Sequence, residues 1–590
     1  MKLYDLMTDN RRENILVGSK KPVFSWRVET EKRNVHQESY RVQVWDEQGN
    51  SVWDSGTVES SRMAGIQYEG KELQSGKRMT WHVSCIFSSD EGVITAEEES
   101  SFETAYHNRE DWKGKFIGET KDHEYHLYRK KFGCKKAVKL SKLYVCGMGA
   151  FECWINGERV SDHVMEPGWT DFRRTCFYTA YDVTEYFAEG ENTENIILVK
   201  LGDCMFNVPG GRYVYFQRSY GKAKLLCQLE LVYEDGSREY VVTDESWKRA
   251  KSPIEFCCIY GGEDFDGKRW TREYLTSEAS EIWEAAVCVE PPLGELKPAP
   301  MEPLRVKEIY QPVSVREVET GVWQYDLGKN FSGWARIFLK TNGSRAGQKV
   351  VLKTAEKLDE NGRIDQSVTG KDYAWTYVLN DKKEQEFAPD FTYTGFRYVE
   401  MTGAVPGKEI SLQGEFIYPD VDQAGDFCCS NTLFNQIHKI ILQAIKSNTK
   451  SYFTDCPHRE KLGWLEQTHL IGPSIMYNLD VHNLYTKIEG DMADSQRENG
   501  LIPDICPEYV TGFDKWHKGF LDSPEWGSAC VLAPWYAYKR YGDLALLEKY
   551  FPVMKKYVEY LSSKTHHEVL HHGLGDWLDI GPCTPHSQNT

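Results

Sequence analysis

The sequence predicts a multidomain chain in which all-β sandwiches come first and an all-α domain follows. The chain has 590 residues, several times the usual length of one domain, so three or four domains are expected. Up to about residue 420 the apolar residues recur with a period of 2, which is typical of strands. After about residue 425 the period changes to 3.6, which is typical of amphipathic helices.

The first β-domain is expected over residues 1–108. Residues 38–46 alternate polar and apolar side chains before a turn at 48–50, and residues 79–85 repeat the alternation. Short alternating strands separated by turns favour a small immunoglobulin- or fibronectin-like sandwich.

Two further β-domains are expected over 109–296 and 297–420. In the first of them, strands at 142–146 and 151–155 lead to Asn156-Gly157, the strongest short hairpin signal. A proline-rich stretch between 290 and 300 indicates the linker to the next domain. That domain has its clearest strands at 334–339 and 396–401.

The all-α domain is expected over residues 421–590. Its helices are predicted at 431–448, 464–478, 481–498, 525–541 and 543–562. The last helix is expected to be capped by Asp543 and to bend or restart at Pro552. Long connections, at 449–463, 499–524 and 563–590, alternate with short ones. Because helices joined by tight turns run antiparallel, all three long connections should emerge at the same end of the bundle.

Composition limits the classes of partner. A formal charge of −18 leaves no basic face for a nucleic acid. No apolar run approaches the roughly 18 residues that span a bilayer, and the first residues lack the apolar core of a signal peptide. The 16 cysteines form no Cys-x-x-Cys pair, and no metal site is expected. We therefore expect a cytoplasmic protein with reduced thiols, without nucleic-acid or membrane partners.

Carboxylates and indoles gather in the three long connections. The candidate residues are Asp455, Arg459, Glu460, Trp464 and Glu466 around the first, Glu525 and Trp526 after the second, and Asp576 and Trp577 in the third. Glycoside hydrolysis needs such groups, because one carboxylic acid protonates the leaving oxygen and other side chains hold the hydroxyls.

Acidic residues near helix starts are often only caps, and we favour that interpretation for Asp504, Glu508 and Asp514. For Asp455 and Glu460 we favour a functional role over a role as caps. Cys456-Pro457 and Gly463-Trp464 fix the loop between them, and Arg459 supplies a fork-shaped partner.

Residues 454–467 resemble the signature loop of glycoside hydrolase family 78, the bacterial α-L-rhamnosidases. The resemblance implies that Glu460 is the general acid and that Asp455 binds sugar hydroxyls. It also favours sugar binding by Arg459, Trp464, Glu466, Glu525, Trp526, Asp576 and Trp577. Further similar segments, in order, are 155–172, 330–334, 355–363, 393–400, 523–527 and 575–582.

The family fold implied is an (α/α)6 six-hairpin barrel of twelve helices behind β-sandwiches, the third of them concanavalin-like. Only five helices are predicted here, so we expect an incomplete barrel and a fragment or truncated product. The inverting mechanism needs a second carboxylate roughly 6.5–9.5 Å away, and this general base is expected beyond residue 590.

The expected substrate is a rhamnose-containing glycan or glycoside, from which terminal α-L-rhamnose is removed. No cofactor is required, although the resemblance allows calcium in a β-sandwich without indicating its ligands. Two alternatives stay open: a non-catalytic carbohydrate-binding protein, to which the 109–296 sandwich would contribute, and an exo-glycosidase of the same clan with another sugar specificity. The sequence predicts no oligomeric state.

Overall fold

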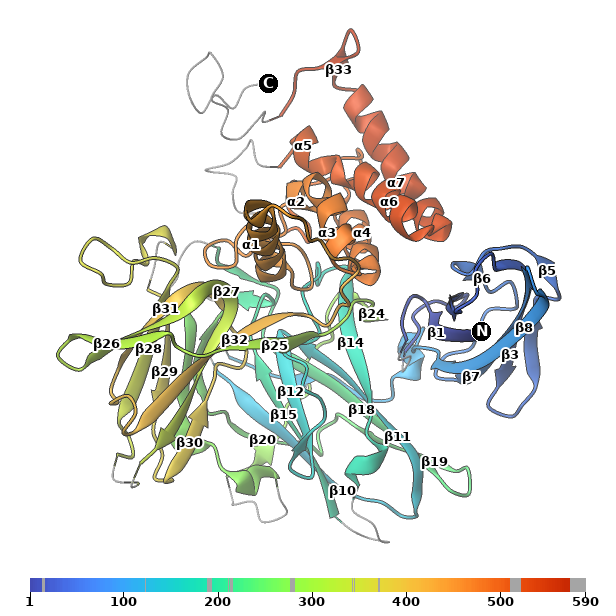
Figure 1. Cartoon of the computed structure of the whole chain (residues 1–590). Helices are drawn as coiled ribbons and strands as arrows, with labels where there is room; N and C mark the ends of the chain where they lie inside the picture. Colours follow the sequence, from blue (N-terminus) through green and yellow to red (C-terminus); the bar gives the residue numbers. More distant parts are fainter. Residues whose placement is uncertain are drawn as a thin grey trace.

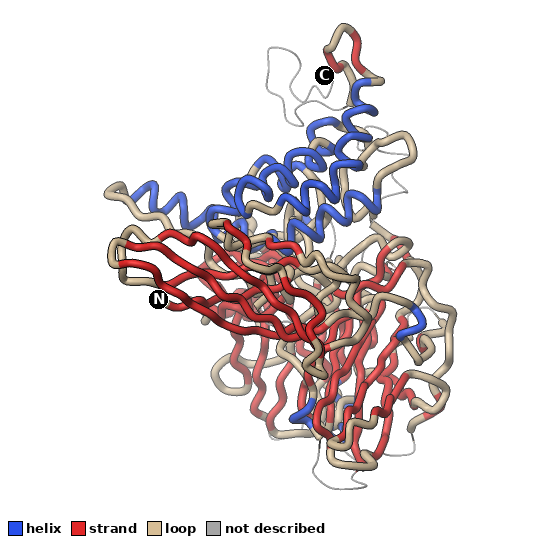
Figure 2. The backbone as a smooth tube through the Cα atoms, turned by 90° about the vertical axis from the view of Figure 1, so that its right-hand side faces the viewer, coloured by secondary structure: helices blue, strands red, loops and turns tan. Residues whose placement is uncertain are grey.

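A computed structural model describes the chain except residues 13–15, 122–123, 188–193, 209, 211, 213–215, 276–281, 342, 344, 370–371, 510–520 and 574–590. Strands β1 to β32 precede the α-helices in the chain, and the two-residue strands β33 (Thr565–His566) and β34 (Val569–Leu570) follow them (Figure 1). In the perpendicular view the helices lie together on one side of the strands (Figure 2). The predicted order of an all-β part and an all-α part is therefore confirmed.

The N-terminal domain contains a three-stranded sheet, β1-β2-β6, and a five-stranded sheet in which β4-β3-β7-β8 follow one another and β5 pairs with β3. Phe24 and Trp81, one from each sheet, pack at 4.6 Å between ring centroids in their common core. The strands are Lys2–Thr8 (β1), Val23–Glu29 (β2), His36–Asp46 (β3), Ser51–Asp54 (β4), Val58–Glu59 (β5), Ile66–Gln67 (β6), Arg78–Ser89 (β7) and Gly92–Glu103 (β8).

Two six-stranded sheets follow, β13-β12-β15-β10-β20-β23 and β19-β18-β11-β14-β24 with β9 beside β18. Apolar side chains from both sheets form one core, which includes Ile155, Val199, Leu143 and Leu229. The strands are Ile117–Gly118 (β9), His126–Gly133 (β10), Val138–Met148 (β11), Ala150–Ile155 (β12), Glu158–Arg159 (β13), Thr175–Asp182 (β14), Glu194–Gly202 (β15), Lys224–Tyr233 (β18), Arg238–Val242 (β19), Lys248–Lys251 (β20), Glu284–Ala285 (β23) and Glu295–Pro298 (β24).

A ten-stranded sheet, in the order β21-β22-β29-β28-β31-β27-β32-β25 with β26 and β30 beside β27, supports the helices. It combines strands from both sides of residue 296, because β22 pairs in parallel with β29. The strands are Ile254–Cys258 (β21), Gly262–Asp266 (β22), Leu304–Tyr310 (β25), Ser314–Glu319 (β26), Val322–Lys340 (β27), Lys349–Ala355 (β28), Ala374–Val378 (β29), Glu384–Phe387 (β30), Thr394–Thr402 (β31) and Ile410–Pro419 (β32).

The helices are Thr432–Asn448 (α1), Glu466–Leu470 (α2), Gly472–Asn478 (α3), His482–Ser495 (α4), Pro524–Gly527 (α5), Ala529–Tyr541 (α6) and Leu544–Ser562 (α7). The helix predicted at 464–478 is divided at Ile471, because Pro473 opens a new helix. The predicted restart at Pro552 is wrong: α7 is continuous, since one missing hydrogen bond is tolerated between intact turns. Asp543 does cap α7, accepting a hydrogen bond from the Leu546 amide at 2.9 Å.

The apolar stripe of α1 is largely exposed within the described part of the chain. Leu433 is 57% exposed, Phe434 54% and Ile440 67%, whereas Ile445 near the end of the helix is buried. The predicted amphipathic helix is therefore present, but the described residues do not cover its apolar face. None of the described helices is both long and apolar enough to cross a membrane.

Candidate active site

The candidate site is built around the loop from Asp455 to Trp464, between α1 and α2. The loop closes on itself, since the Asp455 amide donates to the Leu462 carbonyl at 3.3 Å and the Lys461 amide donates to the Cys456 carbonyl at 3.2 Å. Lys461 adopts the left-handed region with φ of 52°, which is uncommon outside glycine and indicates that the surroundings hold the turn.

Both carboxylate oxygens of Glu460 accept a hydrogen bond. Arg459 Nη2 donates to Oε1 at 2.7 Å, and Trp464 Nε1 donates to Oε2 at 2.7 Å. The Glu460 side chain is 20% exposed, and that of Arg459 is 54% exposed. Glu460 therefore has a fixed orientation and remains accessible, as a group that exchanges a proton with a substrate requires.

Residues of the β-domains form hydrogen bonds with this loop. The Tyr260 hydroxyl, between β21 and β22, donates to the Glu460 carbonyl at 2.7 Å. Lys461 Nζ donates to the carbonyls of Ile259 and Tyr393, each at 2.5 Å. The Lys461 side chain is fully buried, and this burial lowers its pKa to about 7. Sequence reasoning missed these supports, because Tyr260 and Glu460 lie 200 positions apart.

The second long connection packs against the first. The Cys506 amide donates to the Gly463 carbonyl at 3.0 Å, and the Leu465 amide donates to the Asp504 carbonyl at 3.0 Å. A Cβ atom on Gly463 would lie 2.3 Å from the Cys506 carbonyl oxygen, so only glycine allows this approach. The third connection begins beside the second, because His572 Nε2 lies 2.7 Å from Asp522 Oδ2. The described parts of the three connections thus meet at one end, as predicted.

Three carboxyl groups around Glu460 have raised pKa values. Burial, followed by the charge of Glu460, raises the pKa of Asp455 to about 7. Burial also raises the pKa of Glu466 and of Asp504, each to about 7. Glu466 Oε2 and Asp504 Oδ2 are buried without a hydrogen-bond partner. All three carboxyl groups can therefore carry a proton near neutral pH.

The two indoles predicted for the site lie together. The rings of Trp464 and Trp526 are 6.2 Å apart between centroids, at 59°, and Trp526 is only 6% exposed. Glu525 is exposed beside them. Asp576 and Trp577, the other predicted sugar-binding residues, lie outside the described residues, as does Asp514.

Two carboxylates of the second connection, Asp504 and Glu508, have hydrogen-bond or ion-pair partners. Asp504 Oδ1 accepts a hydrogen bond from the amide of Ser523, the residue just before α5, at 2.8 Å. Asp504 thus holds the segment that precedes the helix, and its interpretation as a cap stays a prediction. Glu508 forms ion pairs with Arg497 and, at 3.5 Å, with Arg173. Among the described residues no group of three or more His, Cys, Asp or Glu could hold a metal ion.

Comparison with known protein families identifies four matching models along the chain. They are a Rha78A-like N-terminal immunoglobulin domain at 3–108, an alpha-L-rhamnosidase N-terminal domain at 136–308, a bacterial alpha-L-rhamnosidase concanavalin-like domain at 316–418 and a bacterial alpha-L-rhamnosidase 6 hairpin glycosidase domain at 422–590. The β-rich part is thus followed by a segment of the six-hairpin class.

Individual relatives agree with these models. An alpha-L-rhamnosidase of Formosa agariphila is 28% identical over 97% of this chain, and this chain spans 65% of that relative's length. A solved alpha-L-rhamnosidase structure from Dictyoglumus thermophilum is 33% identical with a TM-score of 0.90, over 99% of this chain and 67% of that one. The Streptomyces avermitilis enzyme solved with L-rhamnose shares the fold, at 21% identity and a TM-score of 0.89, over 99% of this chain and 73% of that one. This chain belongs to the bacterial α-L-rhamnosidase family.

Proposed function

We propose that this protein is a glycoside hydrolase that removes terminal α-L-rhamnose from a glycan or glycoside, with Glu460 as the general acid of an inverting mechanism. The main support is the pair of hydrogen bonds, 2.7 Å each, by which Arg459 and Trp464 orient the two oxygens of Glu460. Glu460 would pass its proton to the glycosidic oxygen as the bond to the sugar breaks.

The neighbouring groups fit the binding of a neutral sugar. Asp455 and Glu466, whose pKa values are about 7, can each accept or donate a hydrogen bond to a sugar hydroxyl. Trp464 and Trp526 supply the apolar wall. We assign Arg459 to the orientation of Glu460, and Glu525, Asp576 and Trp577 to sugar binding as the family resemblance implies.

An inverting reaction also needs a carboxylate that activates water, roughly 6.5–9.5 Å from the acid. We assign Asp455 and Glu466 to sugar binding rather than to this role, and we propose that the base lies outside the described part of the chain. The cytoplasmic location and the calcium site remain predictions from sequence.

The test compares nitrophenyl α-L-rhamnoside with methyl α-L-rhamnoside as substrates. Nitrophenolate leaves readily without a proton, whereas methoxide does not, so Glu460→Gln should lose more activity on the methyl glycoside. A loss of roughly 10²–10⁴-fold is expected for that substrate. Glu548→Gln, an exposed substitution on α7, is the matched control.

Other outcomes separate the alternatives. Rhamnose binding without hydrolysis by the folded wild-type protein would indicate a carbohydrate-binding role. Hydrolysis of nitrophenyl β-D-glucuronide but not of the rhamnosides would indicate another sugar specificity. Equal losses on both rhamnosides would exclude Glu460 as the proton donor.

A further inference from the structure

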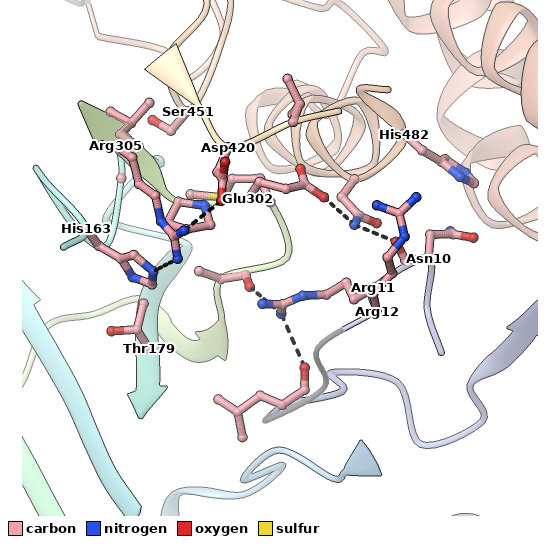
Figure 3. Close-up of a pocket in the computed structure, with 18 of the residues that line it drawn as sticks. Asn10, Arg11, Arg12, His163, Thr179, Glu302, Arg305, Asp420, Ser451 and His482 are labelled. Atoms are coloured by element: carbon pink, nitrogen blue, oxygen red, sulfur yellow. Dashed lines mark hydrogen bonds and ion pairs between the residues drawn. The ribbon is translucent and has the colours of Figure 1, made fainter. Parts of the chain in front are cut away.

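A cavity lies away from Glu460, where the N-terminal domain, the second and third β-domains and the helical domain meet. Its volume is about 810 Å³, and none of the described residues that line it belongs to the loop 455–464. Figure 3 shows its walls, with Arg11 and Arg12 from the first domain, His163 from the second and His482 from α4. A volume of this order at a domain junction is typical of small-molecule sites.

One wall contains a carboxylate with an unused oxygen. Asn483 Nδ2 donates to Glu302 Oε1 at 2.7 Å. Glu302 Oε2 is buried and has no hydrogen-bond partner. Leaving a buried acceptor unpaired costs about 1–3 kcal/mol. A ligand that donates a hydrogen bond to this oxygen would recover that free energy.

The neighbouring guanidinium group is also only weakly bonded. Arg11 Nη1 donates to the carbonyls of Leu16 at 3.3 Å and Ala299 at 3.4 Å, and Arg11 forms no ion pair among the described residues. Burial lowers the pKa of Arg11 and raises that of Glu302, and the charge of each partly offsets this effect on the other. A ligand with several hydroxyls could serve both groups, because hydroxyls can donate to a carboxylate and accept from a guanidinium.

On the opposite wall the charged side chains pair with one another. Arg305 lies 2.9 Å from Asp420 Oδ2 and 3.1 Å from Asp162 Oδ1. Its Nη2 atom lies 3.2 Å from His163 Nε2, and His163 Nδ1 lies 3.0 Å from Glu166 Oε1. Polar groups that are held in this way can form hydrogen bonds with the hydroxyls of a ligand without moving.

Charge excludes one class of ligand. Among the described residues that line the cavity, five are arginines and seven are carboxylates, a formal charge of −2 with neutral histidines. Such a lining disfavours phosphates, sulfates and uronic acids.

The aromatic residues exclude another class. Trp26, Tyr178 and Tyr181 line the cavity but are buried, and the ring of Tyr541 is stacked on His482 at 4.3 Å. No open ring among the described lining residues offers a platform for a flat aromatic ligand. A neutral saccharide fits the polar groups that are left, because its hydroxyls can both donate to Glu302 Oε2 and accept from Arg11.

We propose that this cavity at the junction of the four domains binds a neutral saccharide, with Glu302 and Arg11 as its central contacts. The site is separate from the loop of Glu460 and does not depend on the proposed hydrolase activity. It would tether a glycan to the β-domains while another part of the chain acts on it.

Saturation-transfer NMR with L-rhamnose, D-galactose, D-glucose and D-xylose tests the proposal. The background is the double variant Asp455→Asn, Glu460→Gln, so that sugar contacts of the candidate active site are weakened. At least one of the four sugars should give a saturation-transfer signal. In a titration with that sugar, Glu302→Gln should weaken the affinity about tenfold or more. Glu295→Gln, at an exposed position, should leave it unchanged.

Glu302→Gln keeps the oxygen that accepts from Asn483 and so preserves the shape of the wall. Arg11→Lys, which keeps the charge but loses the fork, should weaken binding in the same way and serves as a second variant. D-Galacturonate differs from D-galactose by its carboxylate and should show no saturation. The proposal is overturned if none of the four sugars binds, if both cavity variants bind like Glu295→Gln, or if the uronate binds as well as the neutral sugars.

Discussion

Glu466 offers a test of the electrostatics around the candidate site. Its side chain lies at the start of α2, and Oε2 is buried without a hydrogen-bond partner. Burial raises its pKa from the ordinary 4.5 to about 7. Because the folded pKa lies above the unfolded one, the stability that protonated Glu466 contributes is fully present below pH 4.5 and is lost as the pH rises through about 7. Glu466→Gln removes this dependence.

The magnitude follows from the pKa. Each pKa unit corresponds to about 1.36 kcal/mol, so the change from 4.5 to about 7 means that ionised Glu466 destabilises the folded chain by about 3 kcal/mol. A domain of 150–250 residues changes its melting temperature by about 2–4 °C per kcal/mol. We therefore expect Glu466→Gln to melt like wild type at pH 5 and roughly 6–12 °C higher at pH 9.

Differential scanning fluorimetry of both proteins between pH 5 and pH 9 measures this difference. Asp455 and Asp504 also have pKa values of about 7 and titrate in both proteins. The charge of Glu466 is the smallest of the effects that set the raised pKa of Asp504, so most of the Asp504 titration cancels in the comparison. Glu548→Gln, on the exposed side of α7, controls for the general effect of losing a carboxylate. If Glu466→Gln and wild type differed in melting temperature by the same amount at pH 5 and at pH 9, the assignment of Glu466 as a buried, protonated carboxyl group would be refuted.

Three other predictions concern the support of the helices and the loop. Lys461→Met removes the donor to Ile259 and Tyr393, so amides of residues 455–464 should exchange hydrogen faster by mass spectrometry; unchanged exchange would show that the lysine does not hold the loop. Asp543→Ala removes the cap of α7 and the 2.9 Å contact with His482 and should cost about 1–2 kcal/mol in urea unfolding, whereas Asp543→Asn should recover most of the loss. Because an exposed apolar face favours contacts between molecules, we expect self-association of the wild type in analytical ultracentrifugation and less of it in Ile440→Gln, at a position 67% exposed on α1; identical sedimentation profiles would argue against contacts through this face.

Local patterns predicted local structure well. Asn156-Gly157 forms a two-residue turn between β12 and β13 with both φ angles positive, 51° and 92°, as this dipeptide favours. The stripe of α1 predicted that helix to within one residue, because a period of 3.6 is a property of neighbouring positions. Interruptions of helices were harder to predict, since Pro473 lies in the first turn of a new helix while Pro552 lies inside a continuous one.

Contacts between distant segments could not be predicted in this way. The parallel pairing of β22 with β29 joins residues more than a hundred positions apart, and neither strand contains a signal for the other. The motif around Glu460 indicated the hydrogen-bonding residues Arg459 and Trp464 because they are its neighbours in sequence. It gave no indication of the buried Lys461 contacts, whose partners come from two β-domains.

These contacts explain why the candidate acid depends on more than the helical bundle. Glu460 follows α1 in the chain, yet its carbonyl is held by Tyr260 and the next residue is held by Ile259 and Tyr393. The Gly395 amide adds a hydrogen bond to the Pro457 carbonyl at 3.0 Å, at a point where a Cβ on Gly395 would lie 2.7 Å from the Pro457 ring. Since small displacements of a catalytic group greatly reduce rates, the β-domains help to position the candidate proton donor.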